Sequence, residues 1–329
     1  MKTTLFMAAA TATLAAPATE LTSVQLQDKF SEWISTHNKQ YSVKEVFAKY
    51  NTWKNNHQMI EAHNAKNAGW TMSMNEYGDM TQDEFKAKYM GYKPKQNAYL
   101  RSLNEPDNSN VEVAESLDWR TKGAVTPVKN QGQCGSCWAF STTGSTEGAY
   151  EIAGNSLTAF SEQQLVDCST SEGNMGCNGG LMDQCFEYII KQGSLCTESA
   201  YPYTATGPNA CNVCSSPVPL KMTSYKDVTS GSESALMTAT NIGPVSVAIE
   251  ADQSSFQFYS GGVMDGPCGD QLDHGVLVVG YGTDSSVNKP YWTVKNSWGA
   301  QWGEQGYIRL VRGINQCGLA NQASYPIIG

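Results

Sequence analysis

The first third of the chain carries hydrophobic side chains at helical spacing. Within residues 24–37, the positions Val24, Phe30, Trp33 and Ile34 fall near one face of a helix. Residues 45–64 hold a longer pattern, in which six positions follow at intervals of 4, 4, 3, 4 and 4 residues and so share one helical face. These positions are Glu45, Lys49, Trp53, Asn56, Ile60 and Asn64. The sequence predicts two amphipathic helices that must pack against another part of the protein.

A change in character follows these helices. Residues 73–79 are strand-like and then turn, and residues 81–89 start with Thr81 and Glu84 in the arrangement of a helix capping box. Residues 92–112 are polar, contain prolines and show no period. They are interpreted as an extended linker that is open to proteolysis.

Beyond the linker, helical patterns come first and strand patterns later. Helices are predicted at 136–152, at 161–168 behind a second capping box that starts at Ser161, and at 179–191 with an end at Gly193. Strands separated by glycine-rich turns are predicted at 245–249, 276–280, 291–295 and 307–311. The order of elements indicates an α+β fold.

The N-terminus has the layout of a secretory signal peptide. Lys2 precedes a run of small and apolar residues from Leu5 to Ala16, and Ala16-Pro17-Ala18 provides small residues for cleavage. Residues 1–18 are therefore interpreted as a signal peptide. We expect the protein in the secretory pathway, with a lysosome, a vacuole or the extracellular space as its destination, and no membrane span in the rest of the chain.

Charge divides the chain at the linker. Residues 1–112 hold equal numbers of acidic and basic side chains, so the whole formal charge of −9 belongs to residues 113–329. This acidic balance argues against a nucleic-acid partner. The shift near residue 112 indicates a boundary between a first segment, residues 19–112, and a domain of residues 113–329.

All ten cysteines lie after residue 133, and an even number in a secreted chain indicates a disulfide framework. Two of them lie in residues 130–140, N-Q-G-Q-C-G-S-C-W-A-F, where a turn leads into a helix. Cys137 at the start of that helix would have its thiolate favoured by the helix dipole, which makes it a candidate nucleophile. The alternatives are a structural role for Cys134 and Cys137, or a redox or metal-binding C-x-x-C pair.

A thiol nucleophile usually has a histidine partner. His274 is the one histidine in residues 113–329, so a partner from the same domain must be His274. Asp273 would point to the opposite face of a strand, so Asn296 is the better candidate to orient the imidazole, with Trp298 shielding that bond. Gln131 carries an amide donor that, with the Cys137 N–H, suits a developing oxyanion.

The stretches Q-G-Q-C-G-S-C-W-A-F, L-D-H-G and K-N-S-W-G resemble the papain-like cysteine peptidases. His274 and Asn296 follow Cys137 by 137 and 159 residues, close to that family's spacing. The six-position helix face resembles the E-R-F-N-I-N motif of cathepsin L-type propeptides, with Lys for Arg and Trp for Phe. Residues 73–79 resemble the G-N-F-D pattern, with Ser73 in place of Gly.

The resemblance implies a two-lobed papain-like fold: a helical lobe with Cys137, a β-barrel-like lobe with His274 and Asn296, and a cleft between them. It implies that residues 19–112 are an inhibitory helical propeptide and residues 113–329 the mature peptidase. Gln131 would bind the oxyanion, and Gly179 and Gly180 would bind the substrate backbone. The pocket for the second residue before the scissile bond would be formed by Leu181, Met182, Ala248, Leu272, Gly275 and Gln322, with Trp298 also counted at the substrate site.

Because that pocket is mostly apolar and Gln322 is uncharged, we expect Leu, Phe or Val there rather than Arg. The resemblance also pairs Cys134 with Cys177, Cys168 with Cys211 and Cys268 with Cys317. Cys185, Cys196 and Cys214 remain, and the sequence does not decide between Cys196–Cys214, Cys185–Cys196 and an exchange of Cys211 with Cys214. We favour Cys196–Cys214, with Cys185 as a buried thiol.

The expected protein is a cysteine endopeptidase made as a zymogen, which forms a thioester on Cys137 and uses His274 as acid and base. No cofactor or metal is expected. The expected partners are peptide and protein substrates, its own propeptide as an intramolecular inhibitor and cystatin-type inhibitors, and the expected state is a monomer. A thiol–disulfide oxidoreductase would require a βαβ context around Cys134 and Cys137, and a catalytically inactive homologue would not need all four catalytic positions.

Overall fold

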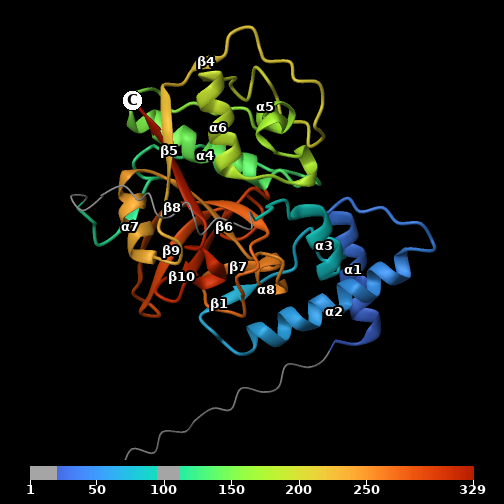
Figure 1. The fold of residues 1–329 in the computed structure, drawn as a ribbon. Helices are drawn as coiled ribbons and strands as arrows, with labels where there is room; N and C mark the ends of the chain where they lie inside the picture. Colours follow the sequence, from blue (N-terminus) through green and yellow to red (C-terminus); the bar gives the residue numbers. More distant parts are fainter. Residues whose placement is uncertain (1–20, 95–111) are drawn as a thin grey trace, which may run out of the picture.

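A computed structural model describes residues 21–94 and 112–329. The expected signal peptide and most of the expected linker therefore lie outside the described residues. Three parts are visible in Figure 1: a mostly helical N-terminal segment (residues 21–94), a lobe built around α4, α5 and α6, and a lobe built around a large sheet. The N-terminal segment lies beside the sheet lobe and reaches the junction of the two lobes through α3.

Helices α1 (Ser23–Thr36) and α2 (Val46–Asn64) confirm the helices predicted at 24–37 and 45–64, and each end agrees to within one residue. Their contact is aromatic: the ring of Phe30 on α1 lies 5.3 Å from that of Tyr50 and 5.5 Å from that of Trp53, both on α2. Val24 does not belong to this buried face, because it is 63 % exposed. Leu26, one helical turn before Phe30, is buried in its place.

The polar positions on the α2 face bind backbone groups of the chain that follows. Asn56 donates from Nδ2 to the carbonyls of Gly78 and Met80, at 2.9 and 3.1 Å. Asn64 donates to the Met72 carbonyl at 2.8 Å and accepts the Met72 N–H at 3.0 Å. These side chains provide hydrogen-bond partners for backbone groups that would otherwise be buried without one. This explains why the docking face of α2 is partly polar.

The strand expected within residues 73–79 lies earlier, at β1 (Trp70–Met72). Residues 73–79 are instead a loop, because Asn75 accepts the Tyr77 N–H at 3.0 Å and closes a local turn. Asn75 also donates to the Gln257 carbonyl at 2.7 Å, which fastens the loop to the sheet lobe. Helix α3 (Gln82–Tyr89) then begins at Thr81 with the predicted capping box.

The helical lobe contains α4 (Cys137–Ile152), α5 (Glu162–Cys168) and α6 (Met182–Gln192). Ser161 caps α5 by accepting the Gln164 N–H at 3.0 Å. The predicted capping box is incomplete, however, because the Gln164 side chain accepts the Cys196 N–H instead. Gly193 ends α6 in the left-handed region, at φ +71°, as predicted.

The second lobe is built on one open sheet with the strand order β1-β7-β10-β9-β8-β6-β11-β5, and β2 pairs with β8. The path does not close into a barrel over the described residues. The strands β6 and β10 match their predicted ranges, whereas β8 and β9 are longer than predicted. The bounds are β2 Leu117–Asp118, β5 Met222–Asp227, β6 Val245–Ile249, β7 Tyr259–Met264, β8 His274–Asp284, β9 Lys289–Lys295, β10 Tyr307–Val311 and β11 Ala323–Ile328.

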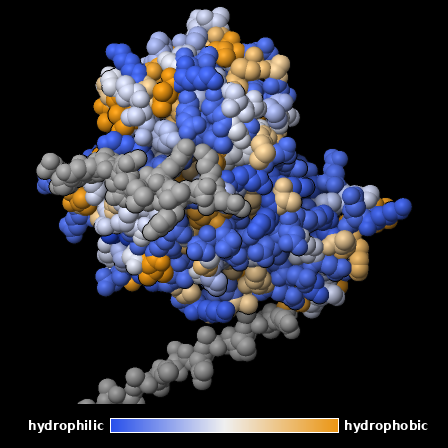
Figure 2. All heavy atoms as spheres, in the orientation of Figure 1, coloured by the Kyte–Doolittle hydropathy of each residue, from blue (hydrophilic) through white to orange (hydrophobic). Residues whose placement is uncertain are grey.

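The remaining elements are short or lie at the edges of the lobes. They are β3 (Ser194–Leu195), β4 (Val218–Pro219), α7 (Glu233–Ile242) and α8 (Ser254–Gln257). In Figure 2, hydrophilic side chains dominate the face in view and apolar ones occur singly or in small groups. No helix within residues 21–94 or 112–329 combines the length and the apolar character needed to cross a membrane.

The first prediction concerns the docking of α2. Asn56→Ala removes both donors to Gly78 and Met80, and we expect the free energy of unfolding to fall by about 1–3 kcal/mol because two carbonyls lose their partners. Urea unfolding of the full-length chain, followed by tryptophan fluorescence, measures this change. Asn55→Ala, at an exposed position of the same helix, is the matched control. Equal stability of the two variants would contradict the role given to Asn56.

Candidate active site

Cys137 is the first residue of α4, and Ser136 makes no side-chain hydrogen bond to the helix start. The side chain of Ser136 therefore does not take up an N–H group of the first turn, although the Ala139 N–H donates to the Ser136 carbonyl at 2.8 Å. The Sγ atom accepts the Gly275 N–H at 3.3 Å and is fully buried. Burial raises the pKa of the Cys137 thiol to about 11, although the N–H groups of Gly275 and Gly91 act in the opposite direction.

His274 is the first residue of β8 and directly precedes Gly275. Its Nε2 lies 2.8 Å from Asn296 Oδ1, which also accepts the Ser297 N–H at 2.8 Å. Because the Asn296 oxygen only accepts, Nε2 carries the proton and Nδ1 is left as the basic nitrogen. Nδ1 is buried and makes no hydrogen bond, and burial lowers the pKa of His274 to about 4, against the Asn296 hydrogen bond that raises it.

The structure places Trp298 over the imidazole and turns Asp273 away from it. The rings of Trp298 and His274 lie 4.8 Å apart, and Trp298 is 1 % exposed, so the bond between His274 and Asn296 is shielded from water. Asp273 uses Oδ1 to accept the Ala251 N–H at 2.9 Å. Trp298 also contacts the rings of Phe85 and Tyr89 on α3, so the N-terminal segment covers this side of the site.

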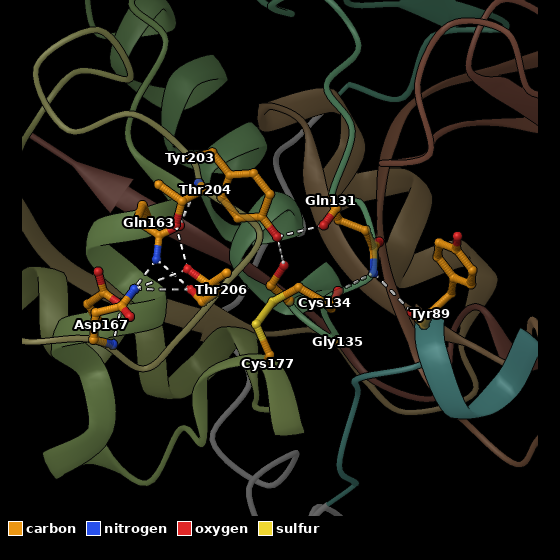
Figure 3. Close-up of a disulfide and its surroundings, with 12 residues drawn as sticks. Tyr89, Gln131, Cys134, Gly135, Gln163, Asp167, Cys177, Tyr203, Thr204 and Thr206 are labelled. Carbon is orange, nitrogen blue, oxygen red and sulfur yellow. Dashed lines mark hydrogen bonds between the residues drawn. A yellow bond between two sulfur atoms is a disulfide. The ribbon is translucent and has the colours of Figure 1, made fainter. Parts of the chain in front are cut away.

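Gln131 lies near the disulfide between Cys134 and Cys177, as Figure 3 shows. Its Nε2 donates to the carbonyls of Cys134 and Tyr89, at 2.9 and 3.0 Å. Ser297 donates from Oγ to Gln131 Oε1 at 2.7 Å, and Tyr203 donates to the Gln131 carbonyl at 2.8 Å. These two supporting residues were not identified from the sequence. Ser297 had a usable signal in its position directly after Asn296, whereas Tyr203 had none.

Residues 89–93 of the N-terminal segment run through the site. The Tyr89 carbonyl accepts from Gln131, the Gly91 N–H is directed at the Cys137 thiol, and the Tyr92 N–H donates to the Asp273 carbonyl at 2.9 Å. The interpretation of residues 92–112 as a linker is therefore wrong at its start. An aromatic residue that follows a glycine in an otherwise polar stretch was the signal available for this.

The Tyr92 side chain is 7 % exposed and packs among the apolar residues expected to form the substrate pocket. Its hydroxyl donates to Gln322 Oε1. Gly275 lies between this pocket and the thiol. Its N–H donates to Cys137 Sγ, and a Cβ at this position would lie 3.3 Å from the Met182 sulfur. The apolar pocket residues that belong to the same hydrophobic cluster as Tyr92 are Leu181, Met182, Ala248 and Leu272.

The two glycines expected to bind a peptide backbone differ in the structure. Gly180 donates to the Gly91 carbonyl at 2.9 Å and accepts the Lys93 N–H at 3.3 Å. Gly179 forms both of its backbone hydrogen bonds within its own loop, to Gly176 and from Met175. Of the two glycines, only Gly180 therefore binds residues 91–93 of the N-terminal segment through backbone hydrogen bonds.

Four disulfides hold the lobes, and Cys137 and Cys185 are the free cysteines. The bond between Cys134 and Cys177 removes the C-x-x-C redox pair from consideration, because Cys134 already has another partner. Cys185 is a buried thiol of α6, and burial raises its pKa far above the usual range. The pairs, which coincide with those favoured from the sequence, are Cys134–Cys177, Cys168–Cys211, Cys196–Cys214 and Cys268–Cys317.

A buried ion cluster holds the helix that carries the thiol. Lys129 Nζ lies 3.0 Å from Glu147 on α4 and 2.6 Å from Glu162 on α5. Burial alone would lower the pKa of Lys129, but the two carboxylates raise it above its usual value. Elsewhere in the described ranges, no three His, Cys, Asp or Glu side chains are grouped so as to hold a metal ion.

Comparisons with known proteins agree with this geometry. Residues 113–327 match the model of the papain family cysteine proteases, and residues 30–85 match the cathepsin propeptide inhibitor domain. The chain is 42 % identical to cysteine proteinase 5 of Dictyostelium discoideum, over the full length of both. It is 44 % identical to procathepsin L of Mus musculus, over 91 % of this chain and 92 % of the relative.

Among solved structures, digestive procathepsin L 3 from the larval midgut of Tenebrio molitor superposes with a TM-score of 0.82 at 44 % identity. That match covers 92 % of this chain and 98 % of the other. The papain-like fold, the propeptide inhibitor domain and the cathepsin L-like relatives agree with one another. The chain belongs to the papain family of cysteine proteases and is a zymogen of that family, with an inhibitor domain ahead of its peptidase domain.

Proposed function

We propose that the protein is a cysteine endopeptidase in which Cys137 is the nucleophile, His274 the acid and base, Asn296 its orienting group and Gln131 an oxyanion donor. One observation carries this assignment. Asn296 fixes the proton of His274 on Nε2, while the neighbouring Gly275 N–H reaches Cys137 Sγ at 3.3 Å. The Nδ1 atom, which makes no hydrogen bond, is thereby left as the basic nitrogen, and we infer that it acts on the thiol.

The reaction proceeds in two balanced halves. His274 Nδ1 takes the thiol proton as Cys137 Sγ attacks the substrate carbonyl, and the resulting oxyanion is bound by Gln131 Nε2 and the Cys137 N–H. Collapse breaks the C–N bond and forms the thioester, and His274 gives its proton to the leaving amine. Water then attacks the thioester with His274 as base, which releases the acid and restores the thiol.

The N-terminal segment inhibits this site by occupying it in the reverse direction. In a substrate, the residue in the pocket before the scissile bond precedes the reacting carbonyl in the chain. Here Tyr92 fills that pocket, and it follows Gly91 at the thiol and Tyr89 at Gln131. The bound segment offers no correctly oriented carbonyl to Cys137, and its burial of the thiol and imidazole favours their neutral forms.

Tyr92 also refines the expected specificity. Its ring belongs to the same hydrophobic cluster as Leu181, Met182, Ala248 and Leu272, which supports a preference for Tyr, Phe or Leu at this position. The hydroxyl of Tyr92 bound to Gln322 supports acceptance of a polar tip at the base of the pocket. An Arg side chain would find no carboxylate partner at Gln322.

We further propose that residues 1–18 are a signal peptide, residues 19–112 the inhibitory propeptide and residues 113–329 the mature enzyme, with cleavage within the linker. Entry into the secretory pathway is supported by the four disulfides, since these persist in oxidising compartments. The destination is then a lysosome, a vacuole or the exterior of the cell. The mature enzyme acts as a monomer on proteins and peptides and is open to cystatin-type inhibitors.

The orienting role of Asn296 can be measured by substitution. Asn296→Ala removes a hydrogen bond to an imidazole that becomes charged, which is worth about 1.5–3 kcal/mol, so we expect kcat/KM to fall about 10- to 150-fold. Initial rates on a fluorogenic peptide, normalised by titration with a thiol-reactive epoxide, give this ratio. Asn155→Ala, at an exposed position after α4, serves as the control. A change of less than twofold in Asn296→Ala would remove Asn296 from the mechanism.

The pocket prediction is tested at Gln322. Gln322→Glu introduces a half-buried carboxylate, so the preference for Arg over Tyr at the second position before the scissile bond should rise about tenfold or more. Gln322→Met is the matched uncharged variant and should instead lower the preference for Tyr over Phe. Peptide-library profiling of the activated enzymes measures both ratios. Dominant cleavage of Arg peptides by the wild-type enzyme would reject the proposed pocket.

The inhibitory fit of the N-terminal segment is tested at Gly91. A Cβ at this position would lie 1.9 Å from the Gly135 carbonyl oxygen, so Gly91→Ala must displace the segment. Overpacking of this kind costs about 1–3 kcal/mol, and we expect the epoxide to label the unprocessed chain about 5- to 150-fold faster. Ser31→Ala, exposed on α1, is the control. Labelling of both variants at the wild-type rate would show that Gly91 does not hold the site closed.

A further inference from the structure

Three buried carboxylates lie near one another, Glu250, Asp252 and Asp273, and Asp273 directly precedes His274 in the chain. Glu250 has its oxygens occupied, because it accepts the N–H groups of Gly269 and Gln271 at 3.0 and 2.7 Å. The other two carboxylates are turned toward α3 of the N-terminal segment. They are the ones available to a charged group that approaches from that side.

Lys86 of α3 is seated between these two carboxylates. Its Nζ lies 2.5 Å from Asp252 Oδ2 and 3.8 Å from Asp273 Oδ2. The side chains of Asp252 and Asp273 are only 10 % and 11 % exposed, whereas that of Lys86 is 49 % exposed. Asp273 Oδ2 is buried and has no hydrogen bond in addition to this ion pair. The two carboxylates, which we call the seat, therefore belong to the peptidase domain, whereas the cation belongs to the N-terminal segment.

The two carboxylates lose their cation when α3 leaves. Burial raises the pKa of Asp273 to about 7, the charges of Asp252 and Glu250 add to this effect, and Lys86 opposes it. Lys86 is the one cation among the groups that act on Asp273 in the described structure. An acidic pair that is preformed and left without a counter-charge will favour a cation from whatever next occupies the site.

The position of Lys86 defines which part of a substrate reaches this seat. Tyr92 fills the pocket for the acyl side of the scissile bond, and Tyr89 lies at the oxyanion donor. Lys86 comes one helical turn before Tyr89, on the same helix as Phe85, whose ring packs on Trp298 at 5.1 Å. The seat is thus on the far side of the catalytic pair from the acyl pocket, where the leaving-group part of a substrate must lie.

We propose that Asp252 and Asp273 form a subsite that selects a Lys or Arg residue on the leaving-group side of the scissile bond, and that Lys86 occupies this subsite in the zymogen as a substrate mimic. The proposal rests on the proposed function, since it uses the direction of substrate binding derived there. Asp252, which makes the shorter contact, supplies most of the selectivity, and Asp273 adds charge only as the pH approaches neutrality.

The test uses wild-type and variant enzymes activated from the full-length chain. Quenched fluorescent peptides share one acyl half and carry Lys, Arg, Met or Glu in turn at the first, second or third position after the scissile bond. For at least one position, we expect kcat/KM for Lys to exceed that for Met by about threefold to tenfold, as for a partly buried ion pair. Asp252→Asn should bring this ratio close to one. Asp265→Asn, which removes a carboxylate paired with Lys289 elsewhere in the sheet lobe, should leave it unchanged.

The wild-type enzyme alone provides a second measurement, which does not depend on a variant that folds. Raising NaCl from about 0.05 to about 0.5 M should reduce the ratio of Lys to Met toward one, because salt screens a partly exposed ion pair. A wild-type ratio near one at every position, or a ratio that Asp252→Asn leaves intact, overturns the proposal and limits Lys86 to holding the N-terminal segment. Failure of the proposed function is distinct, since the Met peptides would then not be cleaved and the epoxide would not label Cys137.

Discussion

The site depends on the close approach of two chain starts, the first residue of α4 and the first residue of β8. This approach is possible because Gly275 has no side chain: a Cβ there would lie 3.2 Å from both N and Cα of Trp138. The resulting contact brings the Gly275 N–H to within 3.3 Å of Cys137 Sγ, and His274 is the residue directly before Gly275. The ion cluster around Lys129 holds α4 through Glu147. Asn296 and Trp298 hold the imidazole of His274 in place through a hydrogen bond and a ring contact. The proposed catalytic pair, Cys137 and His274, therefore lies where the two lobes meet, and neither lobe contains both residues.

The N-terminal segment, which contains the inhibitor domain, makes the contacts that we propose for a substrate. It offers a carbonyl to Gln131, a backbone strand to Gly180 and an aromatic side chain to the acyl pocket, but in the opposite chain direction. This arrangement also changes the chemistry of the pair. With the site covered, burial raises the pKa of Cys137 to about 11 and lowers that of His274 to about 4, so both groups are held neutral. Removal of the segment opens the cleft and also readmits the water that stabilises a thiolate beside an imidazolium.

Sequence reasoning succeeded where a local pattern decides the structure. The periodicity of residues 45–64, the capping box at Thr81 and the glycine after α6 each act within one or two helical turns, so the helices were predicted closely. It failed where a distant partner decides. Gln164 leaves its capping box for the Cys196 N–H, and residues 73–79 form a loop because Asn75 closes a turn and binds the sheet lobe. Likewise, an aromatic residue after a glycine was the one signal near Tyr92, and it could not identify the distant residues that cluster with the ring, such as Met182 on α6 and Ala248 on β6.

The central claim is that the N-terminal segment suppresses the nucleophile by burying it next to its base. The pH dependence of Cys137 alkylation by iodoacetamide, compared between the unprocessed chain and the activated enzyme, tests this claim most directly. The activated enzyme should react rapidly in mildly acidic solution, where a thiolate paired with an imidazolium is present. The unprocessed chain should react slowly there and speed up only as the pH approaches the raised pKa of its thiol, about 11. Identical profiles for the two forms, or alkylation of Cys185 in place of Cys137, would contradict the account.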